Sequence, residues 1–275
     1  MTRAAVALAL LPVAVSCVTA RAPGGDDGAG GPAAAAGPAP GALGKDLVIT
    51  SDSGLRLRPA DGHRVGVDDR VDRHWSRHGD TWVLDLSCPD QDHGHPCARM
   101  PEVDVPDGAD VTVTARDAGV DVVGVDTALD LTTVNGDVTV TRSGRGDAAV
   151  RLSTRNGTVR TAALDARRVT ATTTDGDVLL ACDTAPTAVT AATTNGSVAV
   201  TVPPDSPAYR VDATTANGRA AVDLPAREAG HGPVMKLTTV NVTSAHAAAE
   251  RPAARVRPRP GWPRPTRAPA RHHGR

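Results

Sequence analysis

The chain has 275 residues, with 30 lysines and arginines against 31 aspartates and glutamates, and this balance gives no overall reason to expect a nucleic-acid partner. It contains no phenylalanine, one tyrosine and three tryptophans, so any core must be filled by valine, leucine, alanine and threonine. Such a composition favours a thin, repetitive architecture and disfavours an ordinary globular enzyme.

Residues 1–20 have the order of a secretory signal peptide. Arg3 precedes an apolar run over 4–15, which is too short to span a bilayer as a permanent helix. Residues 14–17, with the sequence AVSC, resemble the lipobox of bacterial lipoproteins, in which the cysteine is acylated and becomes the mature N-terminus. The resemblance implies a lipid on Cys17 and a membrane partner bound through that lipid. Cleavage after Ala20 is the alternative and would give a secreted protein.

The rest of the chain divides into three segments. Residues 21–44 lack periodicity and large apolar side chains, so we expect a flexible tether rich in glycine, alanine and proline. A β-strand-repeat domain is predicted over 45–245. An arginine- and proline-rich tail, predicted to be disordered, occupies 246–275.

Three histidines and two tryptophans lie near the start of the predicted domain. We interpret His63, His74 and His78 as surface residues around Trp75 and Trp82, which would cap the first coil of the repeat structure. A binding edge built from the same five residues is the alternative.

Cysteines in an exported protein meet an oxidising compartment, and Cys88 and Cys97 are therefore predicted to form a disulfide. A metal site made with His93 and His95 is the alternative, but this spacing is not a standard zinc pattern, and no metal or other cofactor is predicted. Cys182 stands alone among the repeats, and we expect it to be a small buried apolar residue.

An internal repeat of about 20 residues is marked by Asn-Gly or Asp-Gly dipeptides. Counted from each glycine, the residues seven and five positions before it and two positions after it are apolar in every copy, and the residue three before it is always threonine. The dipeptides are Asn135-Gly136, Asn156-Gly157, Asp175-Gly176, Asn195-Gly196 and Asn217-Gly218. The threonines are Thr133, Thr154, Thr173, Thr193 and Thr215.

Apolar residues at every second position on both sides of the glycine indicate two short strands per repeat. The strands would meet at a corner where Asn, Asp and Gly tolerate positive φ, and the threonine row would face inward with the apolar residues. Two all-β arrangements fit: a single-stranded β-solenoid with one coil per repeat, or antiparallel hairpins packed as a β-sandwich. The near-constant length of the whole repeat favours the solenoid, because stacked coils must match in circumference.

The repeats are similar to those of a known family. The segments LTTVNGDVTV, LSTRNGTVRT, ATTTDGDVLL, AATTNGSVAV and ATTANGRAAV resemble the bacterial putative-adhesin family of β-strand-repeat proteins, a domain family of unknown function often found on exported lipoproteins. The similarity covers about 45–245 and implies a β-solenoid-like fold at a cell surface. It carries over no catalytic residue.

The sequence contains no phosphate-binding loop, dinucleotide fingerprint, zinc-protease helix or nucleophile elbow. A solenoid glycosidase or lyase would need acids at the same outward position of adjacent coils. One position after each repeat glycine the chain instead has a mixed set, and a non-enzymatic protein is predicted. That set is Asp137, Thr158, Asp177, Ser197 and Arg219.

Threonines also occupy many of the predicted outward positions. We interpret them as ordinary solvent-facing strand residues. A hydroxyl row that binds carbohydrate or another ordered surface, such as ice, is the alternative. These threonines are Thr132, Thr172, Thr174, Thr194 and Thr214.

A sixth repeat begins at Met235 and reaches Asn241, but Val242 stands where glycine is expected and the pattern then stops. Removing one nucleotide from codons for Asn-Gly-Asp-Val gives Asn-Val-Thr-Ser, which is the sequence over 241–244. We therefore interpret the tail, with eight arginines and no acid over 251–275, as a frameshift product. A genuine basic tail that binds nucleic acid, anionic lipid or cell-wall polyanions is the alternative.

These observations predict a cell-surface interaction or adhesion module, anchored by lipid to the outer face of the membrane. Its partner would be an envelope or extracellular protein or glycan, with no specific nucleic acid. An accessory protein that senses envelope stress is a second hypothesis, and a carbohydrate-active β-helix enzyme is a third.

Overall fold

The computed structural model describes residues 45–69, 71–86, 100–224 and 232–249. These ranges form eighteen β-strands, so the all-β prediction is confirmed. They contain no helix long and apolar enough to cross a membrane. Most strands alternate buried and exposed residues, as the period of two in the sequence requires.

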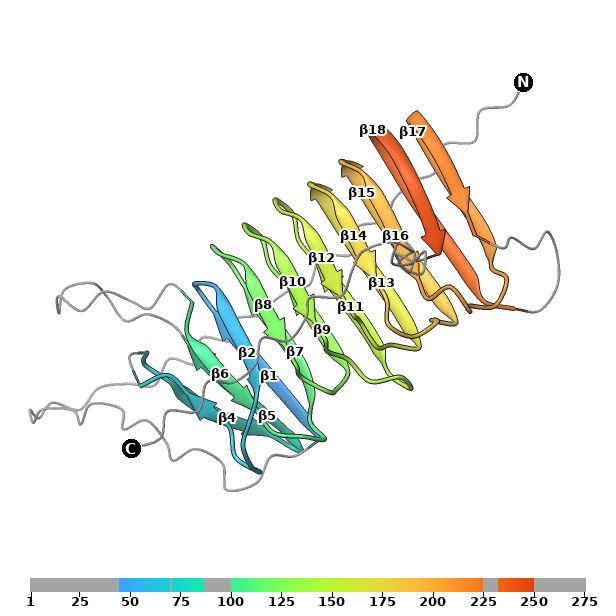
Figure 1. The fold of residues 1–275 in the computed structure, drawn as a ribbon. Coiled ribbons are helices and arrows are strands. Elements are labelled where there is room, and N and C mark those ends of the chain that lie inside the picture. The colour runs from blue at the N-terminus through green and yellow to red at the C-terminus, as the bar shows by residue number, and fades with distance from the viewer. Residues whose placement is uncertain (1–44, 70, 87–99, 225–231, 250–275) are drawn as a thin grey trace, which may run out of the picture. The chain divides into compact units, whose positions relative to one another are not determined.

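A coil of the fold consists of a first strand, a corner and a second strand, as Figure 1 shows for the repeats at the centre of the stack. The first strands are β1 (Asp46–Ser51), β5 (Thr81–Leu86), β7 (Asp110–Ala115), β9 (Leu129–Thr132), β11 (Ala149–Ser153), β13 (Arg168–Asp175) and β15 (Ala188–Asn195). The second strands are β2 (Leu55–Pro59), β6 (Glu102–Val105), β8 (Val120–Val123), β10 (Val138–Thr141), β12 (Val159–Ala162), β14 (Val178–Ala181) and β16 (Val198–Val202). The long strands β17 (Arg210–Asp223) and β18 (Val234–Ala249) each contain both halves of a coil.

First strands pair in parallel with first strands of the neighbouring coils, and second strands pair with second strands. This confirms the β-solenoid and rules out the hairpin sandwich. In the described ranges, antiparallel pairing is confined to β4 (His74–His78) on β5 and β3 (Gly66–Val67) on β6. Both short strands lie at the same end of the stack.

The order of coils in space differs from their order in the chain at both ends. The coil of β1 and β2 lies between the coil of β5 and β6 and the coil of β7 and β8. At the other end, β18 pairs with β15 and β16 on one side and with β17 on the other (Figure 1). The first and the last coil of the sequence are therefore each enclosed by two neighbours.

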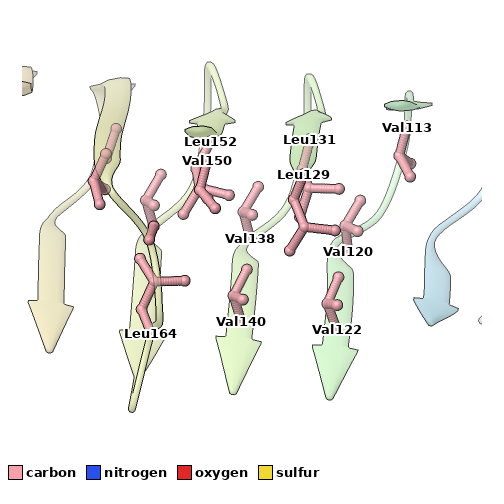
Figure 2. Close-up of a cluster of buried hydrophobic side chains, with 14 of the residues drawn as sticks. Val113, Val120, Val122, Leu129, Leu131, Val138, Val140, Val150, Leu152 and Leu164 are labelled. Atoms are coloured by element: carbon pink, nitrogen blue, oxygen red, sulfur yellow. The ribbon is translucent and has the colours of Figure 1, made fainter. Parts of the chain in front are cut away.

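Inward side chains of both strands form one continuous core. Leu131, Val140 and Leu152 are at most 1% exposed, and the register stacks them on equivalent residues of adjacent coils. Figure 2 shows these side chains in rows that run across the strands. Burial of these aliphatic rows supplies the main driving force for folding. Each coil depends on its neighbours to cover its apolar side chains.

Glycine is needed at the corners because neighbouring backbones approach closely there. A Cβ on Gly176 would overlap the carbonyl oxygen of Gly157 in the adjacent coil, and Gly176 has φ +148°. Gly136 has φ +142°, and a Cβ there would overlap the backbone between Ala118 and Gly119. The repeat glycines thus serve the stacking of coils as well as the turn.

The last described strand runs past residue 245, where the repeat domain is predicted to end. Strand β18 continues through Ala249, beyond the boundary placed at 245, and Ala247 pairs with Val200 and is fully buried. The sequence pattern stops at Val242, and the buried Ala247 gives only a weak apolar signal, so the second half of the strand was not predicted. The tail from 250 onward lies outside the described residues.

Candidate functional site

The inward threonines link adjacent coils by hydrogen bonds. Thr154, Thr173 and Thr193 each donate a hydroxyl to the carbonyl of the corner glycine in the preceding coil, at 2.8 Å. Thr133 donates to the carbonyl of Ala118 at 2.8 Å. The Oγ1 atom of Thr215, in the last coil of the stack, is buried without a hydrogen-bond partner. The hydroxyl of Thr239, at the equivalent position of β18, is likewise buried without a partner. Four of the five predicted threonines therefore link coils and are part of the scaffold.

The corner side chains form a second ladder on the outside. Asn156 donates its amide to Oδ1 of Asn135 at 2.8 Å, and Asn195 donates to Oδ1 of Asp175 at 2.6 Å. Asn217 donates to Oδ1 of Asn241 at 3.1 Å, and within the described ranges its own side-chain oxygen is the last acceptor of the ladder. The irregular register after Asn217 falls at the Gly218 corner. All five predicted corners thus lie in one column along the stack.

One outward row of the first-strand sheet carries hydroxyl groups across most of its length. The pairing register aligns seven hydroxyl residues, with Asp85 at one end and Ala192 as an interruption. Members on neighbouring strands are about 4.8 Å apart, and Thr172 and Thr238, which flank Ala192, are about twice that distance apart. In stack order the hydroxyl residues are Thr50, Thr114, Thr132, Ser153, Thr172, Thr238 and Thr214.

A hollow of about 630 Å³ lies where this row meets the corner column. Thr50 and Thr114 reach it from the hydroxyl row, and Asp85 reaches it from the neighbouring strand β5. Asp52 and Arg116 follow directly after strands β1 and β7 and line the same space. Val134 and Asn135, which follow strand β9, complete the lining, so four neighbouring coils build this hollow, which we call the Arg116 hollow.

Charge and hydrogen bonding in the Arg116 hollow leave groups available to a ligand. Asp117 accepts the amide of Asn135 at 3.2 Å and is held in the ladder. Neither the guanidinium of Arg116 nor the carboxylate of Asp52 has a side-chain partner among the described residues. Asp52, Asp85 and Asp117 outnumber the single arginine, so the lining is acidic.

The sequence did not point to the Arg116 hollow. Thr132, Thr172 and Thr214 were identified as outward residues from the repeat, and the structure places them in the hydroxyl row. Thr50 and Asp85 precede the Asn-Gly repeats, so no sequence marker gave their register. Thr174 and Thr194 are exposed and lie two residues further along β13 and β15, outside the row.

The histidines and tryptophans lie at the end of the stack that β4 covers. Trp75 is buried and packs edge-on against Trp82, with ring centroids 6.2 Å apart, while His74 and His78 are exposed. His63 lines a separate hollow of about 550 Å³ with Asp104. Burial, reinforced by nearby Glu102 and Asp61, raises the pKa of the Asp104 carboxyl above its usual range.

The predicted cysteine sites fall mostly outside the described residues. Cys17, Cys88 and Cys97 all lie there, as do His93 and His95 of the alternative metal site. The described residues contain no group of three or more potential metal ligands. Cys182 is buried in the core as a free thiol, and burial raises its pKa to about 12, so it is not a thiolate at neutral pH.

This chain is similar to a solved structure and to a family of sequences. A crystal structure described as a putative cell adhesion protein from Clostridium sporogenes ATCC 15579 matches 75% of this chain and 94% of that chain, with 9% sequence identity and a TM-score of 0.35. No curated protein matches the sequence. The Toastrack DUF4097 family matches residues 103–246, which is more than half of the 275-residue chain. The resemblance drawn from the repeats is confirmed, and the chain belongs to the Toastrack DUF4097 family.

Proposed function

We propose that this protein is a non-enzymatic adhesion module, held by a lipid on Cys17 at the outer face of the cell membrane, that binds a surface glycan. The observation that carries the proposal is the Arg116 hollow at one end of the hydroxyl row. Arg116 and Asp52 lack side-chain partners within the described ranges and face the same space as two threonine hydroxyls.

The chemistry of the lining suits a polyhydroxylated ligand. Carboxylates accept hydrogen bonds from sugar hydroxyls, whereas a guanidinium donates several in a fixed planar geometry. Val134 also lines the hollow, is partly exposed, and offers apolar contact to the C–H face of a sugar ring. A volume of about 630 Å³ lies within the range of roughly 300–1,000 Å³ typical of small-molecule sites.

The charge of the lining narrows the class of glycan. Three carboxylates against one guanidinium disfavour a phosphorylated or sulfated chain, because the ligand's charges would be repelled. We therefore expect a neutral or amine-bearing glycan. Further units of such a chain would extend from the hollow along the hydroxyl row, beginning at Thr132 and Ser153.

The N-terminal sequence supports display at the membrane surface. A lipid on Cys17 would fix the chain to the outer leaflet, and the glycine- and proline-rich stretch over 21–44 would give the domain reach. Mass spectrometry of the mature N-terminus from fractionated cells tests this part. A diacylglyceryl group on Cys17 is the expected result, and an unmodified N-terminus at Arg21 would contradict the anchor.

Binding is tested with the purified protein on an array of neutral, amine-bearing and anionic glycans. Arg116→Ala should weaken binding to the glycans that the wild-type protein binds on the array by about tenfold or more, because it removes a charge-assisted hydrogen-bond donor. The matched control is Arg160→Ala, another exposed arginine, which lies on β12 in the second-strand sheet. Equal loss in both variants, or retention of anionic glycans alone, would contradict the proposed site.

A cellular experiment separates adhesion from sensing. Deletion of the gene should reduce attachment to glycan-coated surfaces and leave the response to envelope-active compounds unchanged. The reverse result would favour the envelope-stress hypothesis. Turnover of any glycan on the array would instead indicate an enzyme.

A further inference from the structure

The two ends of the coil stack differ in whether their edge strands are covered. At the end formed by β5 and β6, the short antiparallel strands β4 and β3 cover the edges. Strand β4 is five residues long and exposes His74, Arg77 and His78. Short, charged edge strands are a known means of preventing further strand pairing.

The opposite end is formed by β17, which pairs only with β18 among the described strands. It presents an edge of 14 residues without proline. In the interior, an inward residue donates its backbone N–H to the next coil, as Thr133 does to Ser153 at 2.9 Å and Thr154 to Thr172 at 3.1 Å. The equivalent N–H groups of β17 belong to Val211, Ala213 and Thr215 and face an edge without a described coil.

Side chains at this end are also incompletely covered. Val189 and Ala191 of β15 are 1% and 0% exposed, whereas their equivalents Val211 and Ala213 of β17 are only partly buried. The side-chain oxygen of Asn217 ends the corner ladder without a further donor among the described residues. The β17 end therefore has the backbone groups, the apolar rows and the ladder of an interior coil on a terminal face.

We propose that the β17 end is a dimerisation surface whose occupant is the β17 end of a second copy of this chain. Among the described strands, none pairs with the outer edge of either arm of the β17 coil, and a single peptide strand would cover only one arm. A second coil end matches the shape of both arms, and a two-fold arrangement would pair each arm with its own counterpart in antiparallel fashion. Because the β4 end is blocked, the contact closes at two copies and does not continue into a filament.

The test is sedimentation velocity of the full-length protein carrying Cys17→Ser. This substitution removes the acylated cysteine, so lipid-driven association does not contribute to the measured equilibrium. We expect a reversible monomer–dimer equilibrium. A monomer at all concentrations up to the highest attainable would overturn the proposal. Ala213→Pro removes one edge N–H, since the strand's hydrogen bonds to β18 come from the alternate residues, and should weaken the dimer by about tenfold or more.

A control variant and a second measurement distinguish loss of the dimer interface from misfolding of the proline variant. Thr214→Ala changes an outward side chain of the same strand and should leave the dimer unchanged. Hydrogen exchange of the wild-type protein should show protection of the Val211, Ala213 and Thr215 amides that increases with protein concentration. Dimerisation with concentration-independent exchange at these amides, or a folded Ala213→Pro variant that dimerises normally, would overturn the assignment.

Discussion

Asn241 donates its side-chain amide to Oδ1 of Asn195 at 2.9 Å, although 46 positions separate the two residues in the chain. Asn217, which lies between them in sequence, instead donates to Asn241 from the other side. The ladder follows the order of coils in space and shows that β18 is inserted between β15 and β17. Strand β18, the last described strand, is thereby paired along both edges, which protects it from fraying.

Disulfide trapping tests this insertion. Ala192→Cys with Thr238→Cys should form a disulfide within one chain, because these outward residues are register partners on adjacent strands about 4.8 Å apart. The matched pair Ala192→Cys with Thr214→Cys should remain reduced, since β18 separates them by two strand spacings, beyond the reach of about 7 Å for bridged Cα atoms. Peptide mapping identifies the bonds. Bridging of the second pair alone would mean that the coils follow chain order.

The local features of the fold could be predicted from the sequence, but the order of the coils could not. A threonine three residues before each glycine and apolar residues at alternate positions fix the strands, their inward face and their corners. Nothing local distinguishes β18 as an inserted strand, because Met235 and Leu237 have the same spacing as Val211 and Ala213. The order depends on which edges are free to pair, and that is a property of the whole stack.

Gly176→Ala should lower the free energy of unfolding by about 1–3 kcal/mol, because the new Cβ would overlap the Gly157 carbonyl and φ at this position is +148°. Urea denaturation measures the change. Gly62→Ala is the control, since Gly62 has open space around its Cβ position. Similar stability of both variants would contradict the role of Gly176 in coil stacking.

Thr173→Val should destabilise the protein by about 1–3 kcal/mol, because it leaves the part-buried carbonyl of Gly157 without the hydroxyl that donates to it at 2.8 Å. Thr215→Val should be neutral or slightly stabilising, because its buried hydroxyl has no partner. The two variants share the same chemical change at equivalent positions of different coils. Thermal melting compares them, and equal losses would show that the hydroxyl bonds contribute nothing specific.

The candidate site was less accessible to prediction than the scaffold. Asp85 and Thr50 become neighbours of Thr114 only because β1 is enclosed between β5 and β7. The sequence marks coils by their corner dipeptides, and the coils of β1 and β5 have none. Reasoning from the repeat therefore identified Thr132 and Thr172 but not the Arg116 hollow at the end of their row.

Cys182 should resist alkylation in the folded protein. Its pKa of about 12 leaves almost no thiolate at pH 8, and the side chain is only 7% exposed. Iodoacetamide followed by peptide mass spectrometry should find Cys182 unmodified under native conditions and fully modified in denaturant. Rapid native labelling would mean that the coil around β14 opens readily.

The frameshift hypothesis bears on the corner of β18, which is longer than the corner it pairs with. Val198 lies three residues after Asn195, whereas its partner Ala245 lies four residues after Asn241, so β18 holds one extra residue at its corner. Restoring the other reading frame would place Gly-Asp-Val after Asn241, remove the extra residue and put a valine in register with Val198. Sequencing the gene from independent isolates decides the matter. We expect the frame after codon 241 to continue with alternating valine, leucine or isoleucine and then a stop, and a frame without that alternation would make the arginine-rich tail a genuine part of the protein.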